Sequence, residues 1–341
     1  MIEVQNMNFL KKFAISVLMS MLFIILLSLV MTGKGGVEKG LPKFIIKSKA
    51  EPQNIKVYMT REHKIEEMTL ENYVLGVVAG EMPAEFSEEA LKAQAVAART
   101  FGVAHMEAYG GKKYKSNTGA DVCDTVECQV FKSKEERMDT WPKSKANEYW
   151  LKIKQAVQDT SGQVLSYKGK LVMEPYYFAI SGGRTENAKD VFEGGAEYLK
   201  SVDSPGEENG HNKYKTSLGV SYKDFVDKIN LYYPGARLNA GNLSSEVSIQ
   251  DRTEGGAVKE IRLGSIIISG TKFRAIMGLN STNFNINFRD KIYIDCLGYG
   301  HRVGMSQWGA DAMGKNGKTY VQILSHYYTG IKLKDVSLFL K

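Results

Sequence analysis

Glu81 is the residue of this chain whose surroundings best suit acid–base chemistry, because it stands at a corner between two expected helices. Apolar residues recur every three or four positions over 70–78, which predicts a helix with one buried face that ends near Gly80. A second helix is expected from Ser87 to about residue 105, and Pro83 separates the two. Such a corner would hold one carboxylate in place, as a proton donor requires. A solvated loop glutamate is the alternative.

Two cations, Lys92 and Arg99, lie seven residues apart in the second expected helix and therefore on one face. Ala95, Ala97 and Ala98, which precede Arg99, indicate close packing around it, and a packed arginine needs a carboxylate or a substrate as partner. A cation beside Glu81 would lower the pKa of that acid. We therefore expect Arg99 to pair with another acid, such as Glu186, or to hold substrate. A structural salt bridge is the alternative.

Two glycine-punctuated stretches, 176–186 and 300–310, add hydroxyl and amide groups. Glycines let a ligand approach the backbone closely, so each stretch could form a polar wall of a groove. The candidates for substrate contact in these stretches are Tyr177, Ser181, Thr185, Glu186, His301, Ser306 and Gln307. The alternatives are an ordinary strand-to-loop turn in the first stretch and a hydrogen-bonded structural histidine in the second.

Cys123 and Cys128 form a C-x4-C loop, whereas Cys296 lies in an apolar strand-like run. The pair could bind a structural zinc ion, form a disulfide outside the cell, or remain as free thiols. Zinc would need further ligands. The candidates are His105, His301 and Asp124.

The 341 residues that must position these groups allow one large or two medium domains. Residues 13–31 contain no charge and are long enough to cross a bilayer as a helix, and the lysines before them predict a cytoplasmic N-terminus. A cleaved signal peptide is the competitor, but no small-residue cleavage site follows closely. The predicted parts are a cytoplasmic N-terminus (1–12), a transmembrane anchor (13–31), a linker (32–53) and a catalytic domain (54–341).

Helical and strand-like patterns are interleaved through the catalytic domain, which predicts an α+β fold with mixed helices and antiparallel strands. Residues 109–143 look like loops. Further helices are expected at 146–159, after Ser221, at 306–315 and at 320–328. Strands are expected at 163–167, 171–180, 246–251, 258–263, 265–269, 284–288 and 291–297. A net charge of +7 suits an anionic neighbourhood such as cell wall, and the dispersed basic residues contain no nucleic-acid motif.

Five stretches taken together resemble the stage II sporulation protein D family and its relatives, the amidase enhancers. They are 73–83, 90–100, 123–129, 181–186 and 300–310. The resemblance covers about residues 56–330 and includes the N-terminal anchor. Relatives often have histidine before the second cysteine, where this chain has Glu127, so the chain departs from that ligand pattern.

The resemblance implies a peptidoglycan lytic transglycosylase that cleaves the MurNAc–GlcNAc β-1,4 bond without water and needs no cofactor for the chemistry. It places the catalytic glutamate at Glu81 and the arginine of the alanine-rich helix at Arg99. It also implies an extracytoplasmic domain at the septal membrane during forespore engulfment, with an amidase partner that makes peptide-free glycan. The alternative is a non-catalytic, glycan-binding amidase enhancer.

A single carboxylate suffices for this reaction, whereas most glycosidases use two. The acid protonates the glycosidic oxygen, then takes the proton of the MurNAc 6-hydroxyl as that oxygen closes on C1. A residue with both roles needs a raised pKa, which partial burial of Glu81 against Met82 and Phe86 would supply.

Overall fold

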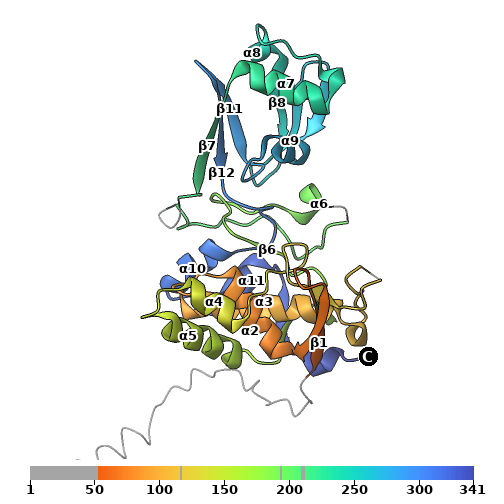
Figure 1. The fold of residues 1–341 in the computed structure, drawn as a ribbon, viewed down its shortest axis with the longest axis vertical. Helices are drawn as coiled ribbons and strands as arrows, with labels where there is room; N and C mark the ends of the chain where they lie inside the picture. Colours follow the sequence, from red (N-terminus) through yellow and green to blue (C-terminus); the bar gives the residue numbers. More distant parts are fainter. Residues whose placement is uncertain (1–52, 116, 193, 209–211) are drawn as a thin grey trace, which may run out of the picture. The chain divides into compact units, whose positions relative to one another are not determined.

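The computed structural model describes residues 53–341 apart from 116, 193 and 209–211 (Figure 1). The predicted anchor, at 13–31, lies outside the described residues. Within the described ranges, no helix is long and apolar enough to cross a membrane. The described residues belong to one compact unit of helices and mostly antiparallel sheets, which confirms the α+β class.

Two helices, α2 (Leu70–Glu81) and α3 (Glu88–His105), form the centre of the first hydrophobic core. The side chains of Thr69 and Ser87 accept hydrogen bonds from backbone N–H groups of the first turns, so both helices begin where their capping residues predict. Gly80 does not end α2 as expected. The helix continues one residue further and ends at Glu81 itself.

Helices from distant parts of the chain surround this pair (Figure 1). Those packed against α3 are α5 (Ala146–Asp159), α10 (Gln307–Lys315) and α11 (Tyr320–Tyr327). The stretch predicted as loops contains α4 (Lys134–Thr140), which begins with a capping box between Ser133 and Glu136. This S-x-x-E signal was present in the sequence and was missed.

Small sheets border the helices. One has the order β2 (Lys64–Thr69), β1 (Asn54–Met59), β3 (Val122–Cys123), and another the order β14 (Ile331–Asp335), β4 (Gln163–Tyr167), β5 (Lys170–Leu171). The strand predicted at 171–180 is wrong, since only its ends are strand. Its later end, β6 (Tyr177–Phe178), pairs in parallel with β13 (Met305–Ser306) and thereby joins the two glycine-punctuated stretches.

A second hydrophobic core lies in residues 215–297, around Phe225, Phe273 and Phe284. Its sheets have the orders β11 (Phe284–Phe288), β12 (Ile292–Leu297), β7 (Lys215–Val220) and β10 (Ile266–Ser269), β9 (Val258–Leu263), β8 (Val247–Arg252). Its helices are α7 (Tyr222–Tyr232), α8 (Leu243–Glu246) and α9 (Gly270–Met277). The strands predicted from 246 onward are confirmed within two residues. The remaining short helices are α6 (Ala188–Val191), η1 (Glu107–Tyr109), η2 (Pro234–Ala236) and η3 (Val336–Phe339).

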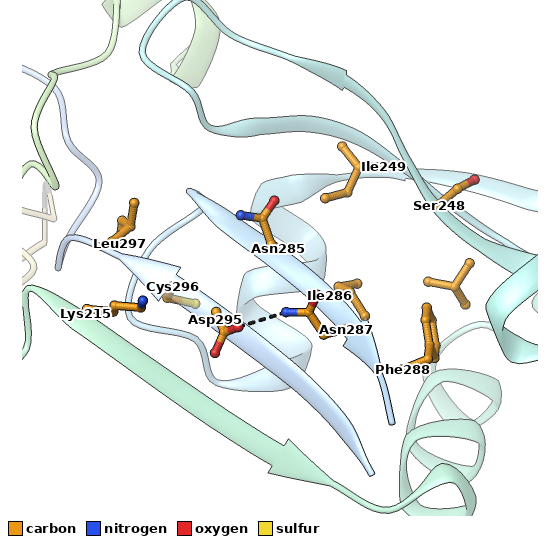
Figure 2. Close-up of a pocket in the computed structure, with 11 residues that line it drawn as sticks. Lys215, Ser248, Ile249, Asn285, Ile286, Asn287, Phe288, Asp295, Cys296 and Leu297 are labelled. Carbon is orange, nitrogen blue, oxygen red and sulfur yellow. Dashed lines mark hydrogen bonds between the residues drawn. The ribbon is translucent and has the colours of Figure 1, made fainter. Parts of the chain in front are cut away.

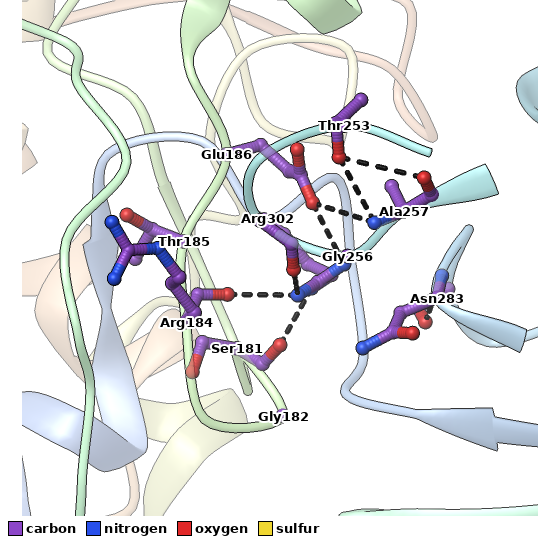
Figure 3. A network of polar contacts seen from close by, with 12 residues as sticks. Ser181, Gly182, Arg184, Thr185, Glu186, Thr253, Gly256, Ala257, Asn283 and Arg302 are labelled. Carbon is purple, nitrogen blue, oxygen red and sulfur yellow. Dashed lines mark hydrogen bonds and ion pairs between the residues drawn. The ribbon is translucent and has the colours of Figure 1, made fainter. Parts of the chain in front are cut away.

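A buried ion pair joins the glycine-punctuated stretches to the second core (Figure 3). Arg302 and Glu186 are both fully buried, with Nη1 of the arginine 2.9 Å from Oε1 of the glutamate. Arg302 also donates to the carbonyl oxygen of Gly255, in the turn between β8 and β9, and Glu186 accepts from the N–H of Ala257 there. Removing Arg302 or Glu186 would leave the other charge buried and unpaired, which is strongly destabilising. The ion pair therefore holds the β8–β9 turn against the two glycine-punctuated stretches.

Candidate active site

The carboxylate of Glu81 is held at the C-terminal end of α2 by a backbone group from a later segment. Its Oε1 accepts a hydrogen bond from the N–H of Val130 at 2.7 Å, and the side chain is only partly exposed. Burial raises the pKa of Glu81, while the Val130 hydrogen bond and the nearby Gln307 and Tyr177 side chains oppose that rise. The net rise in pKa favours the protonated form of this acid, which is the form that a proton donor needs.

Two glycines one turn apart in α2 allow the later segment to lie against the helix. A Cβ on Gly80 would come within 2.5 Å of the carbonyl oxygen of Val130, and one on Gly76 would overlap the ring of Phe131. The N–H of Lys132 donates to the carbonyl oxygen of Gly76 at 3.1 Å. Only glycine at both positions lets residues 130–132 approach closely enough to reach Glu81.

Gln129 links Glu81's neighbour Tyr177 to the core. Its Oε1 accepts from the Tyr177 hydroxyl at 2.8 Å, and its Nε2 donates to the Tyr73 hydroxyl at 3.0 Å. Burial, and then the charge of Glu81, raise the pKa of Tyr177 well above its usual value. Tyr177 therefore remains a protonated phenol throughout the neutral range, with its O–H donated to Gln129 and its oxygen able to accept a hydrogen bond. Sequence reasoning did not single out Gln129 or Val130.

Two buried glutamine amides near Glu81 and Tyr177 are incompletely satisfied. Gln94 is fully buried close to Tyr177, and Gln307 begins α10 close to Glu81. Neither atom of the Gln94 amide, nor Nε2 of Gln307, has a hydrogen-bond partner among residues 53–341 as far as they are described. An unmade buried hydrogen bond costs about 1–3 kcal/mol, and ordered water or a ligand usually accounts for such a group. Gln307 keeps a small exposed surface and therefore suits a site that takes up polar groups, whereas Gln94 is fully buried and is closed to substrate.

An aromatic pair flanks the corner between α2 and α3. The rings of Phe86 and Trp308 meet edge to face with centroids 4.8 Å apart, and Trp308 directly follows Gln307 at the start of α10. Phe86 is buried, and Trp308 is partly exposed. An indole at such a position offers an apolar face beside the polar groups.

The structure corrects the role predicted for Arg99. Its guanidinium makes a two-point contact with Glu71, with Nε–Oε1 at 2.8 Å and Nη2–Oε2 at 2.7 Å, and it also donates to three backbone carbonyls. Arg99 is fully buried, so no substrate can reach it. Its partner is therefore not Glu186. It is not Glu81 either, because Glu71 and Glu81 lie about 15 Å apart along the axis of α2. The structural salt bridge is the correct alternative.

Lys92, the other predicted cation, lies 3.0 Å from Asp159 and 3.4 Å from Glu89 at a partly exposed position. Two helices, α3 and α5, supply this cluster. The structure therefore gives Lys92 a place in the packing of these helices, away from the groups that contact Glu81.

Most predicted polar contacts have structural hydrogen bonds instead. Ser181 donates to the buried Glu207, whose Oε2 also accepts from two backbone N–H groups of the Ser181 turn. Thr185 accepts from the Val202 N–H, Glu186 pairs with Arg302, and Ser306 caps α10. Of the seven polar candidates, the structure brings Tyr177 and Gln307 to Glu81.

His301 is enclosed by the rings of Tyr176, Phe178 and Phe192, with ring centroids 5.5–5.9 Å away. Its Nδ1 accepts from the N–H of Val303 at 3.1 Å, and burial lowers its pKa to about 4. The imidazole is therefore neutral and structural near pH 7, as the alternative reading of this residue predicted.

The described residues around Cys123 and Cys128 do not complete a zinc site. Their Sγ atoms lie 2.9 Å apart, and the Cys128 thiol lowers the pKa of Cys123 to about 6 by hydrogen bonding. Tetrahedral zinc needs four ligands, but among the described residues no three His, Cys, Asp or Glu side chains gather as a metal site. Asp124 instead accepts from Thr60, and His105 faces a backbone carbonyl of its own helix. The described residues therefore supply no further ligands to the two thiols, and zinc at this loop stays a prediction.

A separate groove of about 430 Å³ lies in the second core between β8 and β11 (Figure 2). Its walls mix apolar side chains such as Ile249 and Phe288 with polar ones. Asn287 Nδ2 donates to Asp295 Oδ2 at 2.8 Å across its floor. None of its lining residues was a predicted site residue, and Glu81 is not among them.

Comparison with known proteins places this site in a family. A family model described as "Stage II sporulation protein" matches residues 58–167, which contain Glu81, Gln129 and Val130. Stage II sporulation protein D of Bacillus subtilis (strain 168) is 38% identical over 293 residues, covering 86% of this chain and 82% of that protein. The chain belongs to the stage II sporulation protein D family. The resemblance inferred from the motifs is thereby confirmed, and with it a connection to sporulation.

Two further relatives show the breadth of the similarity. Stage II sporulation protein D of Bacillus amyloliquefaciens is 37% identical over 293 residues, 86% of this chain and 82% of its own. A Bacillus subtilis protein named amidase enhancer is 27% identical over 305 residues, which cover 76% of this chain but 40% of that protein. The family thus shares its sequence pattern with a protein named for enhancing an amidase.

Proposed function

We propose that this chain is a lytic transglycosylase that cleaves MurNAc–GlcNAc β-1,4 bonds of peptidoglycan glycan strands during sporulation. The observation that carries the proposal is the partly buried carboxyl group of Glu81. Its pKa is raised by burial, it is held by a backbone N–H, and it lies beside an unsatisfied amide of Gln307. These are the properties of a positioned proton donor.

The reaction needs two proton transfers at one residue. Protonated Glu81 gives its proton to the glycosidic oxygen as the C1–O bond breaks, and positive charge develops at C1. The MurNAc 6-hydroxyl oxygen then bonds to C1, and its proton returns to the Glu81 carboxylate. The products are a 1,6-anhydro-MurNAc end and a free GlcNAc 4-hydroxyl, and no water is consumed.

The groups that act on the pKa of Glu81 are a backbone N–H, an amide and a phenol, all of them neutral. An inverting or retaining glycosidase would require a second carboxylate about 5–9.5 Å from the first. The one-carboxylate route needs only Glu81, and the neutral groups that contact it are compatible with that route. The Val130 N–H would stabilise the carboxylate between the two proton transfers, because a hydrogen bond to the charged form lowers its free energy.

Neighbouring groups are suited to hold the sugars. Nε2 of Gln307 can donate to a carbonyl or hydroxyl oxygen, and the Tyr177 phenol stays protonated. Trp308 offers an apolar ring face on which a pyranose could stack. In this proposal Glu81 performs the chemistry, while Gln307 and Tyr177 position the glycan.

The setting of the reaction is part of the proposal. The uncharged run at 13–31 would anchor the chain in the membrane with its catalytic domain outside the cytoplasm, at the septum of the sporulating cell. The relative named amidase enhancer supports a link to an amidase that strips stem peptides from the glycan. The expected substrate is therefore peptide-free glycan.

The test is product analysis with the full-length chain and purified, peptide-free glycan strands. Mass spectrometry should detect 1,6-anhydro-MurNAc ends with the native protein and none with Glu81→Gln. Glu85→Gln is the matched control, because Glu85 is exposed on the same corner and should be dispensable. Circular dichroism checks that both variants fold. Native levels of anhydro ends from Glu81→Gln would refute the proposed mechanism.

The second candidate is a glycan-binding amidase enhancer, favoured by the similarity to the protein of that name. It predicts intact strands in the same assay, together with faster peptide removal when a peptidoglycan amidase is added. Glu81→Gln would then leave the stimulation unchanged.

A further inference from the structure

We infer that Cys123 and Cys128 form a disulfide, and that this bond locks in place the segment that holds Glu81 and Tyr177. The first part rests on the geometry of the two thiols. The second part rests on the proposed function, because it concerns the positioning of the catalytic acid.

The two sulfur atoms already face each other. Their separation of 2.9 Å is shorter than the usual approach of unbonded sulfurs, and it exceeds the S–S bond of about 2.05 Å by less than 1 Å. The N–H of Cys123 donates to Sγ of Cys128 at 3.1 Å, and the N–H of Cys128 donates to the carbonyl oxygen of Thr125 at 2.9 Å. These contacts fold the loop so that small side-chain rotations suffice to close the bond.

The acidic side chains that could join the two thiols as metal ligands, Glu127 and Asp124, already have other partners. Glu127 pairs with Lys115 at 2.8 Å and accepts from the Tyr114 hydroxyl at 2.7 Å. Asp124 accepts from both the N–H and the hydroxyl of Thr60. The pair is therefore left with each other as the nearest reaction partner.

The bond would form by exchange with an external disulfide, either a small molecule or a thiol oxidoreductase of an oxidising compartment. One cysteine thiolate attacks the external disulfide, giving a mixed disulfide and releasing one external thiol. The second cysteine then attacks the protein-side sulfur of the mixed disulfide and releases the other external thiol. Two protein thiols are oxidised, and one external disulfide is reduced to two thiols.

The closed loop lies directly beside the groups that hold the catalytic acid. Cys123 belongs to β3, which pairs with β1, so this end of the loop is anchored in a sheet. The residue after Cys128 is Gln129, which binds Tyr177, and the next is Val130, which binds Glu81. A covalent link between β3 and Cys128 limits the movement of these two residues.

Thiol mapping tests the disulfide without any activity assay. The full-length chain, isolated from its own membrane without reductant, is denatured and alkylated, then reduced and alkylated with a second reagent. Cys296, which is buried in the second core, should take the first label. Cys123 and Cys128 should take the second label. Appearance of the first label on both of them would overturn the disulfide, whether or not zinc accompanies the protein.

The locking role is tested by reducing the native protein and by the double variant C123S/C128S, with Cys296→Ser as control. Loss of this short loop closure should lower the Tm by about 5 °C. It should also decrease the release of anhydro ends. Reductant should have no further effect on the double variant. Unchanged melting and cleavage after reduction would overturn the locking role. If native protein cleaves no glycan, the proposed function fails, and the alkylation result still decides the disulfide.

Discussion

Substitution of Gly80 by alanine should disturb the catalytic acid without changing any group that contacts substrate. The added Cβ would lie 2.5 Å from the carbonyl oxygen of Val130, and ordinary contact begins at 3.4 Å, so Val130 must retreat by about 0.9 Å. A movement of that size along the hydrogen bond from Val130 to Glu81 would lengthen it from 2.7 Å to about 3.6 Å. A contact of that length is no longer a hydrogen bond.

The loss should appear in both the rate and its pH dependence. A hydrogen bond to a charged group contributes about 1.5–3 kcal/mol, so its loss should raise the already raised pKa of Glu81 further. Misplacing a catalytic group by about 1 Å can reduce turnover by ~100-fold. The free energy of unfolding should fall by at most about 2 kcal/mol, because the ~1 kcal/mol gained in helix propensity offsets part of the ~1–3 kcal/mol of overpacking.

The assay is the release of anhydro ends from peptide-free glycan as a function of pH, with the Glu81 pKa followed by carbon-13 NMR. The control is Gly219→Ala in β7 of the second core, where the nearest atoms are ring carbons of Tyr293 at 3.5 and 3.7 Å, which is ordinary van der Waals contact. The control should keep the native pH profile. Native turnover and an unchanged Glu81 pKa in Gly80→Ala would refute the argument that Val130 holds the acid.

Three further substitutions test the structural assignments. Arg99→Ala should lower the free energy of unfolding by about 3 kcal/mol or more, while the protein that remains folded keeps the native KM. A raised KM together with a native Tm would instead show that Arg99 binds substrate. The native protein should lose stability as pH rises through the raised pKa of Glu81, because the folded state holds that proton more tightly than the unfolded chain. Glu81→Gln has no such proton and should not show this loss. The Tm difference between the two proteins should therefore be small in acid and grow toward neutral pH. The native protein should lose about 3 kcal/mol of stability as pH falls from 6.5 toward 4, because the His301 imidazole takes up a proton in the unfolded chain at a higher pH than in the folded protein. In His301→Gln, stability should depend less on pH over this range. The same pH dependence in the variant as in the native protein would contradict the buried, neutral assignment of His301.

Individual helices and strands could be predicted from the sequence, because periodicity, capping and turn residues act within a few positions of one another. Periodicity located α2, α3 and α5, capping residues marked the starts of α2 and α3, and alternation located the strands from residue 246 onward. The two-residue Lys168–Gly169 turn joins β4 to β5, and both residues adopt positive φ, as a tight hairpin turn requires. The capping box of α4 was equally local, and it was missed because the surrounding stretch looked like loops.

Partners of buried charges were not readable in this way. The expectation offered Glu186 as one possible acid partner of Arg99, whereas the structure pairs Arg99 with Glu71 on the adjacent helix and Glu186 with Arg302. Both choices satisfy the rule that a buried arginine needs a carboxylate. Only the packing of the helices determines which carboxylate comes within reach.

The sequence by itself determined the family, the helix pair and the place of Glu81 at its corner, because motifs, periodicity and capping act over a few residues. The tertiary structure decided what surrounds that acid. Val130 lies 49 residues away along the chain, and Gln307 arrives from a helix near the C-terminus. Hydrogen bonding and burial depend on distances in space, so the raised pKa of Glu81 and the groups that oppose it emerge only when these segments meet.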